Sequence, residues 1–447
     1  MKITKIHIEK FRGFKNENLS LGSLLTGIAG QNGTQKSTLL GIITQTFTLK
    51  ENDPMRAEKP LCGGSYISAF KDKFRLSPVF DKPKDHEWTI SFDSGIADFT
   101  VESIKRSGSP NVRFWKKGAR KEGDGYLSFP TIFLSLKRLV PTAEEVKVLT
   151  DDTLLTAEEL EEFKLLHNKI LITQTPISSA TAITSKNKRS LGVSTNLYDW
   201  NQNSMGQDNL GKIILALFSF KRLKDKYPGQ YKGGILAIDE LDATMYPASQ
   251  VELLKVLRKY AYKLKLQILF TTHSMSLLKA MDALIKETNK KNETANQLKI
   301  IYLKRIDENI EIKQDIDFDS IQLDLNVIAE GCQRPKSKVT VYTEDKENIL
   351  FAKSILKTKA RILNFVDITM SCSMLIEKRV RMANEQITFD KLPQAVGYLT
   401  EQTEQIRQIV AALQPQTSSD KHRLIEIDEA CKITRKAKPT IYTFVRK

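Results

Sequence analysis

The segment from Gly30 to Ser37 (Gly-Gln-Asn-Gly-Thr-Gln-Lys-Ser) constrains the fold most, because it joins a predicted strand at 24–29 to a predicted helix at 39–47. It matches the phosphate-loop (P-loop) pattern GxxxxGK[ST] with one exception. In that pattern backbone N–H groups surround phosphates, the lysine reaches the β- and γ-phosphates, and the hydroxyl binds Mg²⁺. The exception is Gln35, which replaces a glycine and is expected to crowd the pocket or perturb φ. A Gly/Asn-rich turn that happens to precede a Lys-Ser pair is the alternative.

Two apolar strands further along the chain end in polar residues that could act on a phosphate held by this loop. Residues 235–238 run into Asp239 and Glu240. The first carboxylate can hold Mg²⁺, and the second can orient and deprotonate an attacking water. Residues 269–272 end in His273, which could contact a γ-phosphate if it lies at the same edge of the sheet. The alternatives are a solvated acid pair and a histidine with a purely structural role.

Strands alternate with helices over residues 210–287, which predicts an α/β fold with a largely parallel sheet. Residues 141–170 have a helical pattern, and a polar, Ser/Thr-rich stretch follows at 173–206. The last two strands of this part are expected to form a hairpin. The other expected strands lie at 2–9, 65–70, 74–80, 86–92, 97–104, 111–115 and 130–136, and the hairpin at 298–306 and 310–315.

The charge balance favours a polyanionic partner. There are 69 Lys and Arg residues against 53 Asp and Glu residues, a net charge of +16, so nucleic acid is the expected partner. A basic protein with no such partner is the alternative. With 40% hydrophobic and 27% charged residues, the composition excludes wholesale disorder.

Several features indicate a cytoplasmic protein. No stretch approaches eighteen uninterrupted apolar residues, so no transmembrane helix and no membrane partner are expected. The N-terminus lacks the apolar region of a signal peptide. The cysteines lie far apart, which argues against a disulfide framework or a zinc site; they are Cys62, Cys332, Cys372 and Cys431.

In order and context, these elements resemble the ABC-type ATPases of the SMC and OLD-nuclease class, over roughly residues 1–315. The resemblance implies an ATPase that uses ATP and Mg²⁺. It assigns catalysis to Glu240 and His273, and magnesium binding to Ser37 and Asp239. It assigns nucleotide binding to Arg12, Gly30, Asn32, Gly33, Lys36, Ser37 and Thr38. It further assigns the signature motif to Ser204, Gly206 and Gln207, and the D-loop to Asp242.

The same resemblance implies a head-to-tail homodimer, or a higher even oligomer, with ATP held between the phosphate loop of one protomer and the signature of the other. The Q-loop has no clear match, although Ser135 ends a suitable strand. The insert at 141–200 is too short for the coiled-coil arm of SMC proteins. Short inserts resemble instead the ATPase subunits of the Septu and retron-associated anti-phage systems.

This similarity implies an antiviral defence role, in which the chain dimerises on ATP and regulates a partner nuclease subunit. The alternatives are an OLD-type ATP-dependent DNA nuclease and a nucleotide-binding scaffold with little turnover. The expected domains are ATPase lobes at 1–140 and 201–331, a helical insert and linker at 141–200, and two C-terminal segments at 332–381 and 382–447.

Residues 339–345 resemble the opening of a TOPRIM nuclease domain, in which Glu344 would serve metal-dependent cleavage. A working site needs a DxD on a later strand, and the Asp-rich run at 315–319 precedes Glu344 instead. The segment is therefore expected to be incomplete and Glu344 not to be catalytic. In the last segment, residues 425–431 followed by 438–442 resemble the helix-turn-helix of excisionase-like DNA-binding proteins. Residues 421–447 carry eight Lys/Arg against three Asp/Glu, a charge that would bind phosphates. A basic tail or a fusion remnant is the alternative.

Overall fold

The computed structural model divides the chain into two units, Met1–Arg334 and Pro335–Lys447. The residues that it describes are 1–66, 73, 75–93, 95–105, 108, 112–118, 125–140, 148–185, 189–290, 296–329, 339–341, 346–356 and 363–365.

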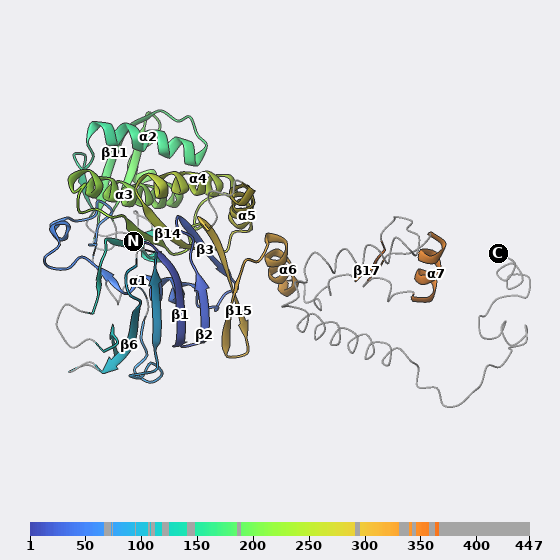
Figure 1. The fold of residues 1–447 in the computed structure, drawn as a ribbon. Coiled ribbons are helices and arrows are strands. Elements are labelled where there is room, and N and C mark those ends of the chain that lie inside the picture. The colour runs from blue at the N-terminus through green and yellow to red at the C-terminus, as the bar shows by residue number, and fades with distance from the viewer. Residues whose placement is uncertain are drawn as a thin grey trace, which may run out of the picture. The chain divides into compact units, whose positions relative to one another are not determined.

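A six-stranded sheet forms the centre of the first unit (Figure 1). Its neighbouring strands are parallel except for the final hairpin, β15–β16, which is antiparallel. The predicted α/β fold with a largely parallel sheet and a closing hairpin is therefore confirmed. In spatial order the strands are β16 (Asn309–Gln314), β15 (Leu298–Ile306), β3 (Leu25–Gly30), β14 (Leu266–Thr271), β13 (Gly234–Ile238) and β9 (Thr131–Leu134).

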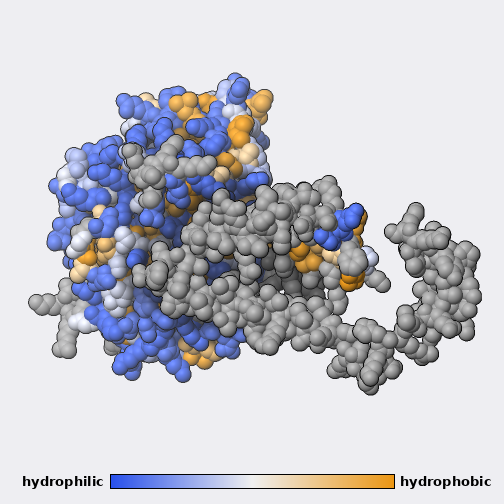
Figure 2. All heavy atoms as spheres, turned by 45° about the vertical axis from the view of Figure 1, so that its right-hand side comes forward, coloured by the Kyte–Doolittle hydropathy of each residue, from blue (hydrophilic) through white to orange (hydrophobic). Residues whose placement is uncertain are grey.

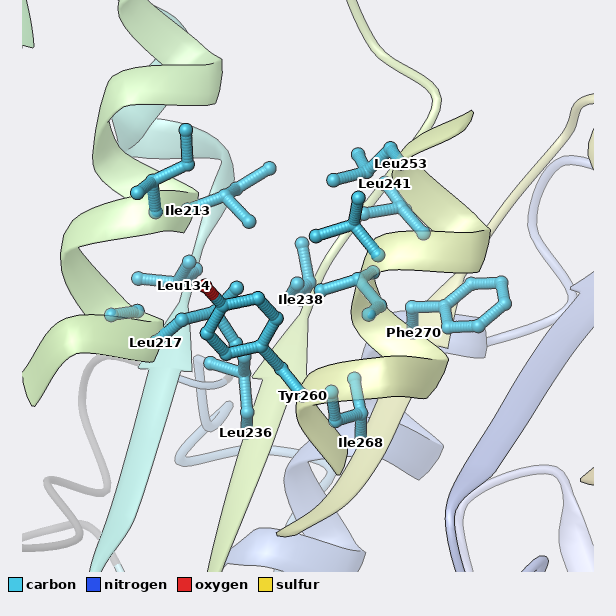
Figure 3. Close-up of a cluster of buried hydrophobic side chains, with 14 of the residues drawn as sticks. Leu134, Ile213, Leu217, Leu236, Ile238, Leu241, Leu253, Tyr260, Ile268 and Phe270 are labelled. Carbon is cyan, nitrogen blue, oxygen red and sulfur yellow. The ribbon is translucent and has the colours of Figure 1, made fainter. Parts of the chain in front are cut away.

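Both faces of this sheet are covered, which explains why its strands are continuously apolar. Along β13, Leu236 and Ile238 join one hydrophobic cluster and Ile235 and Ala237 the other, as the two-residue period of a strand requires. Figure 3 shows the first cluster, in which the sheet meets helices α3 and α4. The helices of this unit are α1 (Lys36–Thr44), α2 (Ala157–Leu171), α3 (Met205–Lys226), α4 (Pro247–Lys263), α5 (Met275–Lys290) and α6 (Phe318–Ala329).

The second cluster contains α1 and the inner face of an antiparallel sheet. Trp88 and Phe114 pack there edge to face, with ring centroids 5.2 Å apart. Residues 14–20, where no strand is predicted from the sequence, form a strand paired with β1. In spatial order this sheet contains β2 (Phe14–Ser20), β1 (Ile3–Phe11), β5 (Glu87–Phe92), β6 (Phe99–Lys105) and β7 (Val112–Lys116). A short pair, β4 (Phe47–Thr48) and β8 (Leu127–Ser128), completes the lobe.

The strand expected at 74–80 is wrong for the residues that the structure describes. Residues 75–77 are irregular and 78–80 form a turn. The Asp81 carboxylate accepts the Ser77 N–H at 2.7 Å, and this local bond closes the chain on itself. The strand expected at 65–70 lies largely outside the described residues.

The insert is not purely helical. Helix α2 forms as expected, with a capping box between Thr156 and Glu159. The polar stretch expected at 173–206 instead contains two strands that pair with each other, and a third strand from before α2 extends their sheet. Helix α3 packs against this sheet. They are β10 (Leu149–Asp151), β11 (Ile177–Thr184) and β12 (Arg189–Thr195). Their small buried residues, such as Ala182 and Val193, explain the fit to α3.

Polar side chains cover most of the face seen in Figure 2, with separate hydrophobic patches toward the top, where Figure 1 shows α2 and β11. Exposed apolar side chains of the insert and its borders include Leu149, Leu165, Ile172 and Leu197. Among the described residues, no helix is both long and apolar enough to cross a membrane.

In the second unit the structure describes a strand–helix–strand sequence. Strands β17 (Val339–Val341) and β18 (Leu363–Phe365) pair in parallel, and α7 (Lys346–Leu356) lies between them in the chain. Glu344 and the whole of 382–447 lie outside the described residues, so the TOPRIM-like and helix-turn-helix segments stay predictions.

Candidate nucleotide site

Four parallel strands bring the predicted site residues to one edge of the central sheet. Strands β3, β14, β13 and β9 are neighbours, so their carboxyl ends meet there. The phosphate loop follows β3, Asp239 follows β13, and His273 lies two residues after the end of β14. A ligand bound at this edge would be contacted by all three segments.

The two predicted magnesium residues are in direct contact. The Ser37 hydroxyl donates to Oδ1 of Asp239 at 2.8 Å, although the residues are 202 positions apart in the chain. The Thr271 hydroxyl donates to the same oxygen at 2.7 Å. Asp239 is only 5% exposed. A hydroxyl and a carboxylate are hard oxygen ligands, so this pair fits Mg²⁺.

Lys36 folds back over the phosphate loop. Its ammonium donates to the carbonyls of Gly30 at 3.0 Å and Gln31 at 2.9 Å. Burial lowers the pKa of Lys36 to about 8, although the nearby carboxylates, led by Glu240, act in the opposite direction. A phosphate group could replace the two carbonyls as the partner of this ammonium.

Gln35 adopts a left-handed backbone conformation, which glycine accepts without a steric cost. Its φ is 63° and its ψ 31°, in the left-handed region, just before α1 begins. Holding a residue with a Cβ there costs about 1–2 kcal/mol. Gly30 and Gly33 also have positive φ, 149° and 78°. The expected perturbation of φ at Gln35 is therefore seen as a left-handed conformation, which carries an energetic cost.

The Gln35 side chain crowds the turn after β1. A Cβ placed on Gly13 would lie 2.8 Å from Nε2 of Gln35, so the amide packs directly on this glycine. Oε1 of Gln35 is buried without a hydrogen-bond partner among the described residues.

Two other predicted nucleotide-binding residues differ in burial. Asn32 is exposed in the phosphate loop, and Thr38 is buried in the first turn of α1.

Glu240 is held in a strained conformation. Its φ is 51°, again left-handed. Its N–H donates to the Thr271 hydroxyl at 2.7 Å, and its carbonyl accepts from Arg138 at 2.7 Å. Such conformations persist only where the surroundings fix them, and they are frequent at functional sites.

The other two predicted residues of this edge, His273 and Asp242, contact each other. The His273 N–H donates to Oδ1 of Asp242 at 3.3 Å. Burial, with the charge of Lys36, lowers the pKa of the His273 imidazole. The neutral form is therefore favoured at neutral pH, and it can donate one hydrogen bond.

The predicted signature opens a helix, as expected. The Gln207 N–H donates to the Ser204 hydroxyl at 3.3 Å, and the Ser204 N–H donates to Oε1 of Gln207 at 2.8 Å, which is a capping box. Ser204 is exposed at this helix N-terminus, whereas Gly206 is buried. A Cβ on Gly206 would lie 2.5 Å from the Thr244 carbonyl, so the glycine is required by a loop of its own chain.

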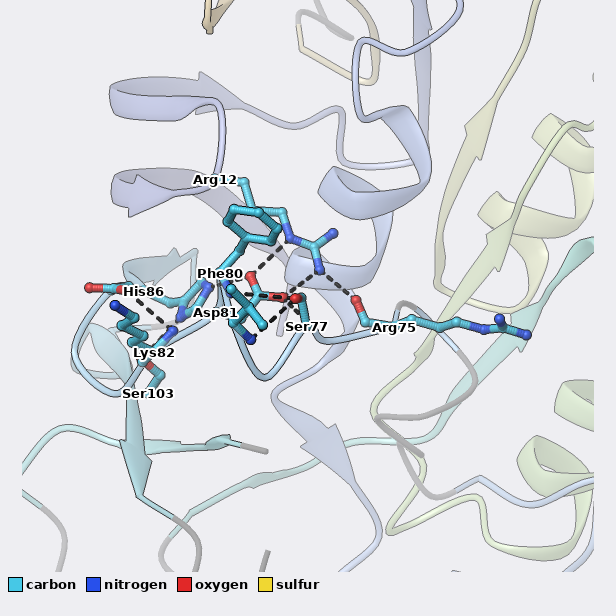
Figure 4. Close-up of polar contacts among 10 residues, drawn as sticks. Arg12, Arg75, Ser77, Phe80, Asp81, Lys82, His86 and Ser103 are labelled. Carbon is cyan, nitrogen blue, oxygen red and sulfur yellow. Dashed lines mark hydrogen bonds and ion pairs between the residues drawn. The ribbon is translucent and has the colours of Figure 1, made fainter. Parts of the chain in front are cut away.

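Arg12 is held by a carboxylate (Figure 4). Its guanidinium donates to both oxygens of Asp81, at 3.2 and 3.0 Å, and to the Arg75 carbonyl at 2.5 Å. His86 contacts the same carboxylate at 3.1 Å. Burial raises the pKa of Asp81, but bonds from Arg12 and neighbouring groups outweigh it, and the pKa lies below its ordinary value. The nucleotide contact of Arg12 stays a prediction.

Sequence reasoning missed three residues that organise this edge: Arg138, Asn209 and Thr271. Arg138 follows β9, just beyond the strand end considered for the Q-loop at Ser135. A charged residue directly after an apolar strand was the available signal. Thr271 could not be distinguished from an ordinary strand residue, because its role depends on pairing between β13 and β14.

One family of known proteins matches this chain over more than half of its length. The family described as "AAA ATPase domain" matches residues 1–124 and 135–277. No curated protein matches the chain. Three of the solved structures that match the chain share low identity with it. The SMC head domain from Thermotoga maritima shares 13% identity and a TM-score of 0.39, over 71% of this chain and 100% of that one.

The second is the Smc head domain with an extended coiled coil bound to the C-terminal domain of ScpA, derived from Pyrococcus furiosus. It shares 13% identity and a TM-score of 0.39, and the match covers 73% of this chain and 99% of that one. The third is the recombination mediator protein RecF-ATPrS, with 12% identity and a TM-score of 0.35. The match covers 69% of this chain and 97% of that one. Similarity at this level is weak and adds nothing to what the site residues themselves show.

The low pKa of Lys36 predicts that ATP affinity falls at alkaline pH. Because the pKa is lowered from 10.5 to about 8, the free protein loses this charge as the pH rises through 8, and binding must then take up a proton. Affinity should fall by up to about tenfold per pH unit above 8. Titration calorimetry at pH 7, 8 and 9 measures this. Arginine stays charged over this range, so a Lys36→Arg variant that binds ATP should show no pH dependence of its affinity. A wild-type affinity that stays constant from pH 7 to 9 would contradict the assignment of Lys36 to phosphate binding.

Gln35→Gly should raise turnover more than affinity. The variant removes left-handed strain and the contact with Gly13 while Lys36 and Ser37 remain. Binding rests on several loop amides, so affinity should change by less than about tenfold. Hydrolysis depends on sub-ångström placement of the γ-phosphate, so turnover should rise by about tenfold or more. ATP affinity and turnover are measured side by side. No change in either, or loss of binding, would show that this account of Gln35 is wrong.

Proposed function

The chain belongs to the AAA ATPase domain family, and on this premise we propose that it binds ATP with Mg²⁺ at the strand edge and hydrolyses the nucleotide. The observation that carries the proposal is the hydrogen bond between Ser37 and Asp239. It joins the end of the phosphate loop to an acid on a strand some 200 residues away, where a magnesium ion and a phosphate can share ligands.

Each residue of this edge has a role in the proposed reaction. Lys36 exchanges its bonds to the loop carbonyls for the β- and γ-phosphates. Ser37 and Asp239 would hold Mg²⁺, which supplies charge neutralisation for the phosphates when bound. Glu240 orients the attacking water and accepts its proton. His273, neutral at physiological pH, donates a hydrogen bond to the γ-phosphate.

We further propose that ATP is enclosed by two copies of the chain arranged head to tail. The support is the exposed N-terminus of α3, where Ser204 and the helix dipole favour an anion. The bonds of Ser204 and Gln207 to each other leave the hydroxyl at the surface, available to a phosphate held by the partner copy. The resemblance to SMC-like ATPases supports the same homodimer.

The proposed biological role is control of a partner nuclease in cytoplasmic anti-phage defence. Its support is the resemblance of the segments AGQNGTQKSTLLGIITQ and FRLSPVFDKPKDHEWTISF to the Septu ATPase subunit. The sequence after Glu344 has no DxD to complete a nuclease site. The net charge of +16 favours nucleic acid as a further partner.

A nucleotide-dependent scaffold with little turnover is a second candidate. The left-handed Gln35 favours it, because the residue crowds the turn beside Arg12. Such a chain would bind ATP and dimerise but release the nucleotide mostly unhydrolysed.

Glu240→Gln tests hydrolysis. The variant keeps the shape of the side chain but cannot accept a proton, so ATP binding should persist while turnover falls by about a hundredfold or more. ATP should then trap a dimer in analytical ultracentrifugation. Glu161→Gln, which breaks only a surface ion pair with Lys164, is the control and should behave as wild type. Unchanged turnover in Glu240→Gln would remove this residue from the mechanism. Wild-type ATP binding and dimerisation without measurable turnover would favour the scaffold.

A mixing experiment tests the head-to-tail arrangement. Lys36→Ala and Ser204→Asp should each be inactive alone. Aspartate keeps the helix cap but repels phosphate, and Ser204→Asn, which caps equally well without charge, is its control. A mixed dimer has one intact site, so an equal mixture should recover up to about a quarter of wild-type turnover. An inactive mixture whose mixed dimers are seen by mass spectrometry would contradict the arrangement.

A further inference from the structure

Arg138 is a buried cation at the centre of the candidate site. It lies in a short 3-10 helix, Leu136–Leu139, directly after β9, and is 1% exposed. Its guanidinium donates to oxygens of other residues through all three nitrogens. Nε bonds Oδ1 of Asn209 at 2.7 Å, Nη2 bonds the Glu240 carbonyl at 2.7 Å, and Nη1 bonds the Ser135 carbonyl at 3.1 Å.

These partners are neutral amide and carbonyl groups, which compensate a buried charge less well than a carboxylate does. The carboxylates of Asp239, Glu240 and Asp242 act on Arg138 only through their field, and burial lowers the pKa of the guanidinium to about 10. The group thus stays charged at neutral pH. An apolar side chain of similar length would fill the same space without this cost, so packing alone does not account for an arginine here.

Asn209 connects Arg138 to the signature helix and to the D-loop. It is fully buried in α3, one turn after Ser204–Gly206. Its Oδ1 accepts from Arg138, while its Nδ2 donates to the Ala243 carbonyl at 3.0 Å. Arg138 and Asn209 therefore join β9, α3 and the loop after β13 in one continuous hydrogen-bonded chain.

The other end of this chain is the backbone of Glu240. The left-handed φ of 51° is fixed from two sides, by Thr271 at the N–H and by Arg138 at the carbonyl. If α3 shifts along the sheet, Asn209 withdraws from Arg138 and the second of these restraints weakens. Glu240 can then relax toward an ordinary conformation, which turns its carboxylate away from the attacking water.

We propose that Arg138 is a positioning residue that couples the seating of the signature helix to the alignment of Glu240, through its shared bonds to Asn209 and the Glu240 carbonyl. The inference rests on the proposed function, in which Glu240 is the general base. It adds a reason why hydrolysis would depend on the partner copy: a phosphate bound at Ser204 seats α3, and Arg138 conveys this to Glu240.

Arg138→Met tests the proposal on the full chain, since methionine fills the space without the bonds. Turnover should fall by about a hundredfold, because the base is misplaced, while ATP affinity stays within about threefold. The melting temperature should fall only slightly, because relief of the buried charge offsets part of the cost of leaving the acceptors on Asn209, Glu240 and Ser135 without their donor. A purely structural arginine would instead lower the melting temperature and affinity together with turnover.

Two variants of Asn209 form a matched pair, and their comparison does not depend on whether Arg138→Met folds. Asn209→Asp keeps the acceptor for Arg138, whereas Asn209→Leu removes it. Asn209→Asp should therefore retain at least about tenfold more turnover than Asn209→Leu. The double variant Arg138→Met/Asn209→Leu should lose no more turnover than Arg138→Met alone, because the bond that Asn209→Leu breaks is already absent in Arg138→Met.

Two results are separable. If the wild-type protein shows no ATP turnover, or only turnover that Glu240→Gln leaves unchanged, the proposed function is overturned, and the inference with it. Turnover retained in Arg138→Met, or equal turnover in the two Asn209 variants, would overturn the inference alone.

Discussion

One carboxylate oxygen, Oδ1 of Asp239, organises the candidate site. It accepts hydrogen bonds from Ser37 at the start of α1 and from Thr271 at the end of β14. Three segments that are distant in the chain are thereby tied at one edge of the sheet, in a buried place where hydrogen bonds are strong and an unpaired charge is costly. Lys36 lies close enough for this carboxylate to influence its pKa. An incoming cation can exchange for the two hydroxyl donors, so the bonds define where Mg²⁺ would bind.

Part of the backbone strain of the described residues lies around this edge. Four non-glycine residues beside the site have left-handed backbone conformations: Arg12, Gln35, Glu240 and Thr244. Each costs free energy and must be fixed by its neighbours. Gln35 packs on Gly13, and Glu240 is held by Thr271 and Arg138. Such a site is poised to change when the surrounding bonds change, which suits a switch controlled by nucleotide.

The sequence alone was sufficient for the central sheet and for the residues at its edge, because apolar strands and a phosphate loop have local signatures. It was insufficient where a role depends on distant partners. The strands at 177–195 were missed because Ser and Thr are typical of loops, and only the packing against α3 reveals them. The Arg12–Asp81 pair has no local pattern, and the position of Arg138 after an apolar strand does not reveal its partners. The 382–447 segment stays a prediction.

The most direct test of the central claim is the magnesium dependence of ATP binding in Asp239→Asn. Asparagine retains an oxygen that can accept from Ser37 and Thr271, so the fold should persist, but it is neutral and a poor ligand for Mg²⁺. Affinity is measured by calorimetry with Mg²⁺ and with a chelator. We expect wild-type protein to bind ATP about tenfold or more tightly with Mg²⁺, and the variant to bind equally with and without it. An undiminished magnesium effect in the variant would contradict the account.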